Sequence, residues 1–392
     1  MRYVGIDIAS EQHFFAIVDG QCVVLSKATP FAEDAGGYEK FFGILGDPAE
    51  TLVVMEATGH YWKNLFADLA ARGFEIALVN PARTHRFAAE DLQRTKTDAI
   101  DALGIARFGA QKRPPPTRVP SAAAEELREL VRLRDRLVQD AGDRTRQLHR
   151  LVDLGFPEFT RFVKSLDTEL ATTILHTYPT AAAFATVSAR RLAGIRYDGR
   201  HKVGPELAAN LVAAAKTSVG RHHGEAYQVQ VRYFCEDLVV LRKRIRQING
   251  DIESKLEEHE IGKLLTTIGG IGPQTAARVI AKFDDPSTYF RNSAAFASFV
   301  GVIPGLRQSG MWRPNRAGCT PIGDADLRAA LWMPTLSATR SNTWLKAHYD
   351  RLIAKGKPPK VAMVACIRKL LLAIYSVAKN RRPFVPELAE AT

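Results

Sequence analysis

The sequence predicts an α/β N-terminal domain, a long helical arm and a mostly helical C-terminal domain. Three observations support this prediction. Apolar, β-favouring segments alternate with helical ones over residues 1–112, a stiff proline-rich break follows, and two long amphipathic stretches then flank an alanine-rich region. We therefore expect domains at 1–112, 113–260 and 261–392, the second of which holds the linker and the arm.

The composition of the chain indicates which kind of partner it binds and in which cellular compartment it works. The net charge of +12 favours a polyanion, nucleic acid first and an anionic membrane surface second, although a generally basic solvated surface would give the same excess. The four cysteines form no Cys-x-x-Cys pair, which argues against a zinc ribbon or a disulfide framework and suits a reducing cytosol. Because the sequence shows no charged-then-apolar leader and no run of 18 apolar residues, we expect a soluble cytoplasmic protein without a membrane partner.

The first domain opens with a strand of the buried type, in which apolar residues surround Asp7. A carboxylate in such a strand is costly to bury unless it is paired, hydrogen-bonded or bound to a cation. Strands alternating with helices beyond an opening hairpin predict a mostly parallel sheet. The other expected strands are 12–18, 22–26, 51–59 and 74–79, and the expected helices are 33–45, 60–73 and a long one that starts at Asn80-Pro81 and ends with the segment 94–103.

Four acidic side chains of this domain indicate a metal site. Asp7 and Glu56 belong to two strands, whereas Asp98 and Asp101, three residues apart, share one face of the long helix. Four oxygen donors at one point suit hard divalent cations such as Mg²⁺ or Mn²⁺, and two such ions stabilise the attacking and leaving oxygens of a phosphoryl transfer. Each acid alone has a plainer explanation. Asp7 also fits the phosphate-binding strand of a sugar kinase or an actin-like ATPase, Glu56 a solvated strand end, and the pair a solvated helix face.

The arm is predicted from two amphipathic stretches. In 122–154 and 234–256 apolar residues recur every three or four positions, and arginines crowd the opposite faces of the first stretch. The two stretches form either a coiled coil, within one chain or between protomers, or an ordinary two-helix hairpin packed on the main body. The basic region 156–225 between them contains nothing that looks catalytic.

Two motifs of the C-terminal domain suit phosphate chemistry. Residues 264–278 are similar to a helix-hairpin-helix element, in which Gly270 and Gly272 would let backbone N–H groups approach a phosphate; a plain turn between two helices is the alternative. Further on, Ser309 precedes a glycine in a loop, which by itself is typical of a turn residue. The basic residues that would contact nucleic acid around this serine and in the last helix are Arg307, Arg313, Arg316 and Lys369.

Taken together, the motifs resemble one family, the DEDD transposases of bacterial insertion sequences, which are relatives of an inversion-catalysing DNA recombinase. The resemblance rests on Asp7 in Gly-Ile-Asp-Ile-Ala-Ser, Glu56 in Met-Glu-Ala-Thr-Gly-His-Tyr-Trp, Asn80-Pro81, and the words Arg-Thr-Lys-Thr-Asp-Ala-Ile-Asp-Ala around Asp98 and Gln-Ser-Gly around Ser309. It covers nearly the whole chain and is loosest over 156–225. One departure is visible, because Pro-Ile-Gly-Asp at 321–324 stands where the family usually has a basic residue and Gly-Asn.

The resemblance implies a ribonuclease H-like (RuvC-like) N-terminal domain that cuts and rejoins donor and target DNA. It also implies Asp7, Glu56, Asp98 and Asp101 as ligands of Mg²⁺ or Mn²⁺, Ser309 as a nucleophile that forms a phosphoserine link, a guide (bridge) RNA, and a homo-oligomer, either a dimer or a tetramer. Two other functions stay open. One is a structure-selective, junction-resolvase-like nuclease that uses the same acids with water, and the other is a non-catalytic nucleic-acid-binding scaffold. An ATPase is the least favoured alternative.

Overall fold

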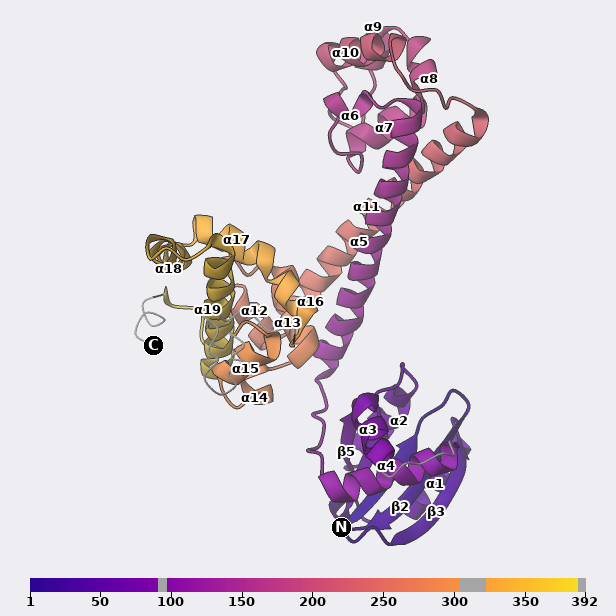
Figure 1. The fold of residues 1–392 in the computed structure, drawn as a ribbon, viewed down its shortest axis with the longest axis vertical. Helices are drawn as coiled ribbons and strands as arrows, with labels where there is room; N and C mark the ends of the chain where they lie inside the picture. The colour runs from indigo at the N-terminus through magenta and orange to yellow at the C-terminus, as the bar shows by residue number, and fades with distance from the viewer. Residues whose placement is uncertain (91–96, 304–321, 387–392) are drawn as a thin grey trace, which may run out of the picture. The chain divides into compact units, whose positions relative to one another are not determined.

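The computed structural model describes residues 1–90, 97–303 and 322–386, and the chain divides into two compact units, Met1–Val119 and Pro120–Thr392 (Figure 1). We call them unit 1 and unit 2. The boundary between them falls at the end of the proline-rich break that the sequence shows. The finer division into three domains, at residues 112 and 260, stays a prediction.

Unit 1 is built on a mixed five-stranded sheet. Its strands are β1 (Arg2–Asp7), β2 (Gln12–Asp19), β3 (Val24–Ala32), β4 (Thr51–Glu56) and β5 (Glu75–Val79), in the order β3-β2-β1-β4-β5. β1, β2 and β3 pair in antiparallel fashion, whereas β1, β4 and β5 are parallel. The expected opening hairpin and parallel continuation are therefore present, with β1 at the centre. β3 is longer than expected, because it continues to Ala32 instead of ending at Ser26.

Helices cover both faces of this sheet. α1 (Ala35–Leu45) and α2 (Trp62–Ala71) pack on one face, and α3 (Pro81–Glu90) and α4 (Asp98–Lys112) pack on the other. A short 3₁₀ turn at Pro48–Glu50 precedes β4. The unit has two separate apolar cores because successive side chains of each strand point to opposite faces of the sheet.

The expectation of one long helix from Pro81 to residue 103 is wrong. α3 ends at Glu90, and α4 begins at Asp98 after Thr97, whose φ is −147° and whose hydroxyl accepts a hydrogen bond from the N–H of Ile100. An extended threonine is a favoured N-cap, so it starts a new helix rather than continuing the earlier one. The apolar periodicity did not reveal this break because both helices bury side chains in the same core.

The close approach of α4 to β1 depends on Gly5. A Cβ at this position would lie 2.1 Å from the backbone nitrogen of Ala106 and 2.4 Å from the backbone oxygen of Ala102. Only glycine permits this separation. Nearer the start of β1, a Cβ on Gly109 would lie 3.6 Å from the ring of Tyr3. α4 therefore runs antiparallel to β1, and its first turn lies at the C-terminal end of the strand.

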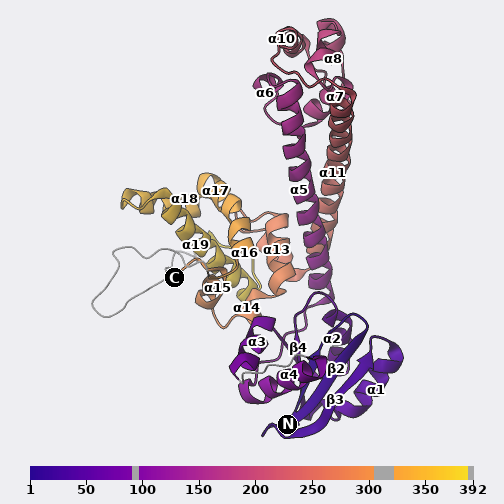
Figure 2. The same cartoon turned by 45° about the vertical axis from the view of Figure 1, so that its right-hand side comes forward.

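Unit 2 contains an arm of two long helices, α5 (Ala122–Gly155) and α11 (Glu225–Glu257), which lie side by side (Figures 1 and 2). The ion pair between Lys255 and Glu126 (2.6 Å) joins the end of α11 to the start of α5, and the pair between Arg144 and Asp237 (2.8 Å) lies further along. The two helices are thus antiparallel and pair within one chain. Coiled-coil packing along the arm stays a prediction.

A helical region stands at each end of the arm. The far end is closed by α6 (Phe159–Phe162), α7 (Glu169–Thr177), α8 (Ala181–Ala185), α9 (Ala189–Ala193) and α10 (Pro205–Lys216), which share a core with both arm helices. The near end packs into a C-terminal bundle that contains α12 (Glu260–Leu265), α13 (Pro273–Phe283), α14 (Pro286–Tyr289), α15 (Ser293–Val300), α16 (Ala325–Ala330), α17 (Trp332–Ser341), α18 (Thr343–Ala354) and α19 (Pro359–Asn380). Within the described ranges, one helix, α19, has the length and apolar composition needed to cross a membrane. It lies in the core of the bundle, however, as the central helix of a globular domain does.

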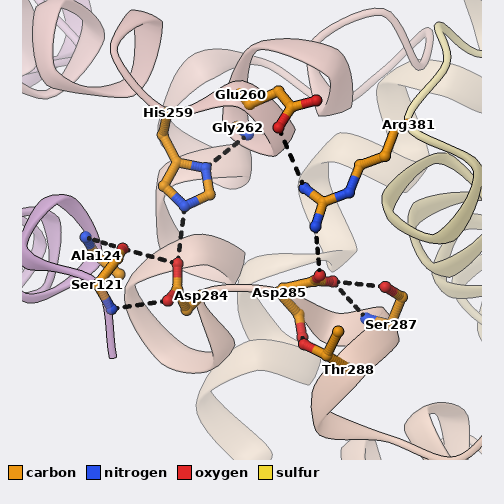
Figure 3. A network of polar contacts seen from close by, with 10 residues as sticks. All are labelled: Ser121, Ala124, His259, Glu260, Gly262, Asp284, Asp285, Ser287, Thr288 and Arg381. Atoms are coloured by element: carbon orange, nitrogen blue, oxygen red, sulfur yellow. Dashed lines mark hydrogen bonds and ion pairs between the residues drawn. The ribbon is translucent and has the colours of Figure 1, made fainter. Parts of the chain in front are cut away.

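A polar network joins the start of α5 to the C-terminal bundle (Figure 3). Asp284 follows α13 with a φ of +59°, and its carboxylate accepts hydrogen bonds from the N–H and the hydroxyl of Ser121 (2.8 and 2.9 Å) and lies 2.8 Å from Nε2 of His259. The adjacent Asp285 accepts a hydrogen bond from Arg381 (2.8 Å). Burial raises the pKa of Asp284, but the hydrogen bonds from His259 and Ser121 outweigh burial, so the net pKa is lowered. The N-cap residue of α5 is thereby fixed to the bundle.

Candidate functional site

Asp7 and Glu56 lie at the same edge of the sheet in unit 1. β1 and β4 are adjacent and parallel, and their ladder ends with Ile6 opposite Met55, so the next residue on each strand is one of the two acids. Side chains at every second position share a face of the sheet. The even-spaced neighbours of both acids belong to the core under α3 and α4, so both carboxylates point to that face, where they are partly exposed.

The first turn of α4 brings two more acids to this edge. Because α4 runs antiparallel to β1, the half-buried Asp101 and the exposed Asp98 lie at the end of β1. We call the region around Asp7, Glu56, Asp98 and Asp101 the acidic corner. Carboxylate oxygens are the donors that a hard divalent cation prefers, so the residue types fit such an ion. Among the described residues, however, no three or more Asp, Glu, His or Cys side chains are grouped closely enough to hold a metal ion.

Thr84 belongs to the acidic corner, and sequence reasoning missed it. This side chain in α3 is only 6% exposed, and its Oγ1 lies 2.5 Å from Oε1 of Glu56. The same oxygen lies 2.8 Å from the carbonyl oxygen of Pro81, and one hydroxyl hydrogen cannot fully serve both acceptors. The contact with Glu56 is the shorter of the two, so the hydroxyl donated to it would orient this carboxylate. The helix start at Asn80-Pro81 could have indicated Thr84, because a helix that begins directly after β5 places its first residues beside the end of the neighbouring strand β4.

A second unpredicted group of polar side chains holds the loop that follows β1. His13 of β2 is fully buried; its Nδ1 accepts a hydrogen bond from the N–H of Ala9 (3.2 Å), and its Nε2 lies 2.5 Å from the carboxylate of Glu33. Tyr38 and Asn64 donate to the same carboxylate. Burial raises the pKa of Glu33, but the hydrogen bonds from Tyr38, His13 and Asn64 outweigh burial and lower it. The network fixes the backbone just beyond the acidic end of β1.

The predicted phosphate-binding turn lies between α12 and α13. Gly270 has a φ of +102°, and a Cβ on it would lie 2.4 Å from the Cβ of Ala338 in α17, so this glycine permits close packing within the bundle. Gly272 directly precedes α13, and a Cβ on it would meet nothing within 4 Å. The helix-hairpin-helix interpretation stays a prediction, and Gly272 is the more open of the two glycines.

The predicted nucleophile lies outside the described residues. Segment 304–321 contains Ser309 together with Arg307, Arg313 and Arg316. The described residues just before and just after this segment lie close together, since a Cβ on Gly323 would lie 2.7 Å from the Cα of Gly301. Asp324, part of the departure from the family pattern, accepts a hydrogen bond from the N–H of Leu327 as the N-cap of α16 and forms an ion pair with Lys282. This aspartate therefore has a structural role.

Comparisons with known proteins agree with this organisation. A DEDD transposase profile of the IS110 type matches residues 4–157, and a profile of the transposase IS116/IS110/IS902 family matches residues 262–350. The pilin gene-inverting protein of Moraxella bovis is 25% identical over 341 residues, which cover 86% of this chain and 83% of the relative. The transposase assigned to the IS117 mini-circle of Streptomyces coelicolor is 25% identical over 406 residues (99% and 96%), and the IS116 insertion-element protein of Streptomyces clavuligerus is 24% identical over 396 residues (98% and 96%).

The sheet, the acidic corner and these matches define a DNA transposase or recombinase of an insertion sequence. The chain belongs to the IS110/IS116/IS902 family of transposases. The family and the enzyme class expected from the sequence are thus confirmed. A DEDD transposase domain implies a ribonuclease H-like fold for unit 1, and such domains generally use divalent metal ions.

Proposed function

We propose that this transposase cuts and rejoins donor and target DNA by a phosphoryl transfer that depends on Mg²⁺ or Mn²⁺ and uses Ser309 as the nucleophile. One observation supports this proposal above the others: the register of β1 and β4, together with the antiparallel course of α4, brings four acidic residues to the same edge of the sheet. When bound there, divalent ions supply positive charge that stabilises the attacking and leaving oxygens.

The protein groups have separate tasks in this proposal. Asp7, Glu56, Asp98 and Asp101 hold the ions, and Thr84 keeps Glu56 in one orientation. Ser309 loses its hydroxyl proton and forms a bond to phosphorus, while the bond from phosphorus to the DNA 3′-oxygen breaks and that oxygen takes up a proton. Attack by a DNA 3′-hydroxyl on the phosphoserine reverses these changes, releases Ser309 and joins the strand.

The partners in this proposal are DNA, a guide RNA and further copies of the chain. The arm offers a surface for a dimer or tetramer with coiled-coil packing. Apolar side chains that the arm leaves exposed include Leu133 (48%), Val138 (42%), Val239 (50%) and Val240 (45%). The open N-terminus of α13 at Gly272 offers N–H groups to a DNA phosphate, as a helix-hairpin-helix element does. The reaction takes place on nucleoid DNA in the bacterial cytoplasm.

Covalent capture tests the proposal. Protein incubated with labelled ends of its insertion sequence and Mg²⁺ should form a protein–DNA adduct that survives denaturing electrophoresis. Asp7→Asn and Ser309→Ala should each abolish the adduct, whereas Ser298→Ala, at an exposed serine of α15, should form it at the wild-type rate. Chelation of divalent ions should abolish it as well.

One competing function has support of its own. All four acids lie within unit 1, so the acidic corner could serve a nuclease that uses water without any group from unit 2. This nuclease would cut DNA without forming an adduct, and Ser309→Ala would cut as fast as the wild type. Either result would reject the serine mechanism. If Asp7→Asn changed neither cutting nor rejoining, the assignment of the acidic corner itself would be rejected.

A further inference from the structure

A groove in the C-terminal bundle has a lining that none of the reaction steps above uses. Its volume is about 1330 Å³, and it lies between α18, α19 and the segment that follows α19. Its basic lining residues are His348, Arg351, Arg368, Lys369 and Arg382, and among the described residues that line it there is no aspartate and no glutamate. A concave surface lined by one sign of charge concentrates ligands of the opposite sign.

The charges in the groove affect one another. Arg351 lies 3.0 Å from Nδ1 of His348, so this nitrogen accepts the hydrogen bond and the histidine is neutral, with its hydrogen on Nε2. The pKa of His348 is lowered, first by burial and then by the positive charges of Lys369 and Arg351. The charges of Lys369 and Arg351 thus add to the effect of burial, and an anion bound beside them would offset their part of the lowering.

The floor of the groove is apolar and partly aromatic. Leu372 is 37% exposed, and Phe384 packs edge-on against Trp344 with 5.0 Å between ring centroids. The N–H of Phe384 donates to Oγ1 of Thr267 (2.9 Å), which holds the segment after α19 in place as a wall. Lys369 lies above the ring of Trp344, 4.4 Å from its centroid.

A cationic rim over an apolar floor fits a single nucleic-acid strand better than a duplex. A single strand can place its bases against apolar and aromatic side chains while its phosphates contact arginines at the rim. A duplex hides its bases and offers only its backbone. Arg351, Arg368 and Arg382 are exposed, as rim residues must be, whereas Lys369 is half-buried.

We propose that the α18–α19 groove binds a single strand of nucleic acid, with phosphates at Arg351, Arg368 and Arg382 and bases against Leu372 and Phe384. This inference rests on the proposed function, in which DNA strands are cut and rejoined with a guide RNA, and it adds a binding site in unit 2 distinct from the acidic corner of unit 1. DNA and RNA strands share the required chemistry, so both are tested.

Binding is measured by fluorescence anisotropy on the full-length chain, with labelled dT and U oligonucleotides of about ten nucleotides and a duplex of matched length. The triple variant R351Q/R368Q/R382Q should weaken single-strand binding on the order of tenfold or more. A plot of the logarithm of its binding constant against the logarithm of the salt concentration should be shallower, by a slope of about 0.7 for each lost phosphate contact. The matched control R340Q/K355Q/K360Q removes the same charge from exposed positions of the bundle outside the groove and should stay within about twofold of the wild type. The preferred sugar identifies the strand as DNA or RNA.

A second measurement follows the histidine. In NMR titrations of histidine-labelled protein, a bound oligonucleotide should raise the pKa of His348 in the wild type, and the triple groove variant should show no such rise. Equal losses in the two triple variants, or tighter binding of duplex than of either single strand, would overturn the proposal. Binding is scored without divalent ions and also with Asp7→Asn protein, which should bind like the wild type. Failure of the groove is therefore distinguishable from failure of the acidic corner.

Discussion

The acidic corner of unit 1 and the α18–α19 groove of unit 2 carry opposite charge and are built in different ways. In the corner, strand register and one glycine contact fix where the carboxylates lie. In the groove, the cations sit on exposed helix faces and on the segment after α19. The comparison teaches that residues fixed by strand register are placed by the backbone, as the proposed ligands of a small ion should be, whereas cations on exposed helix faces can follow a flexible polyanion.

The largest effect is expected at the strand end. Asp7→Asn removes one ligand charge and should lower the rate of strand cutting on the order of a thousandfold, because the charge that stabilises the transition state is no longer held in place. The melting temperature should stay near that of the wild type. Glu11→Gln, an exposed acid in the next loop, is the matched control and should cut normally. Equal loss in both variants would mean that total charge, and not the corner, matters.

Rigidity of the corner is tested next at Gly5. Gly5→Ala places a Cβ against the backbone of α4 and should lower the free energy of unfolding by about 3 kcal/mol, as measured by urea denaturation. Gly104→Ala adds a Cβ to α4 where nothing lies within 4 Å and should be neutral or stabilising by up to about 1 kcal/mol. If Gly5→Ala were tolerated as well as Gly104→Ala, α4 would not be held against β1 as described.

The joint at the base of the arm gives a pH-dependent effect in unit 2. Because the pKa of Asp284 is lowered in the folded protein, its ionised form contributes stability above the ordinary aspartate value of 3.8, and this contribution is lost as pH falls through the folded pKa. Asp284→Asn tolerates the positive φ but should cost about 2 kcal/mol at neutral pH and flatten the acid limb of the stability curve. Asp140→Asn, at an exposed position of α5, should leave that limb unchanged.

The smallest effect is expected from the residue that orients Glu56. Thr84→Val keeps the shape of the side chain and removes the hydroxyl, so the rate of cutting should fall about tenfold, as is usual for a group that positions a metal ligand. Thr84→Ser keeps the hydroxyl and should restore most of the rate. A serine variant as slow as the valine variant would assign Thr84 to packing alone.

Local patterns predicted the regular parts of unit 1 well. The alternation around Asp7, the run that ends at Glu56 and the three-residue spacing of Asp98 and Asp101 placed all four acids on the correct kinds of element. They did not predict the break at Thr97. A threonine that caps a new helix and a threonine inside a continuous helix look the same in the sequence. The local patterns gave no sign of the His13–Glu33 pair, whose partners are 20 residues apart in the chain. For the contact between Thr84 and Glu56, 28 residues apart, the only local signal was the helix start at Asn80-Pro81.

By itself, the sequence determined most strands and helices of unit 1, the family, and the kind of element on which each of the four acids lies, because periodicity and motifs are properties of short segments. Tertiary structure alone decided that α4 runs antiparallel across Gly5, that Gly270 serves packing against α17, and that cations from α18, α19 and Arg382 line one groove. Each of these facts is a contact between segments that are distant in the chain. Such contacts are selected by how whole surfaces fit together, and no window of residues contains that information.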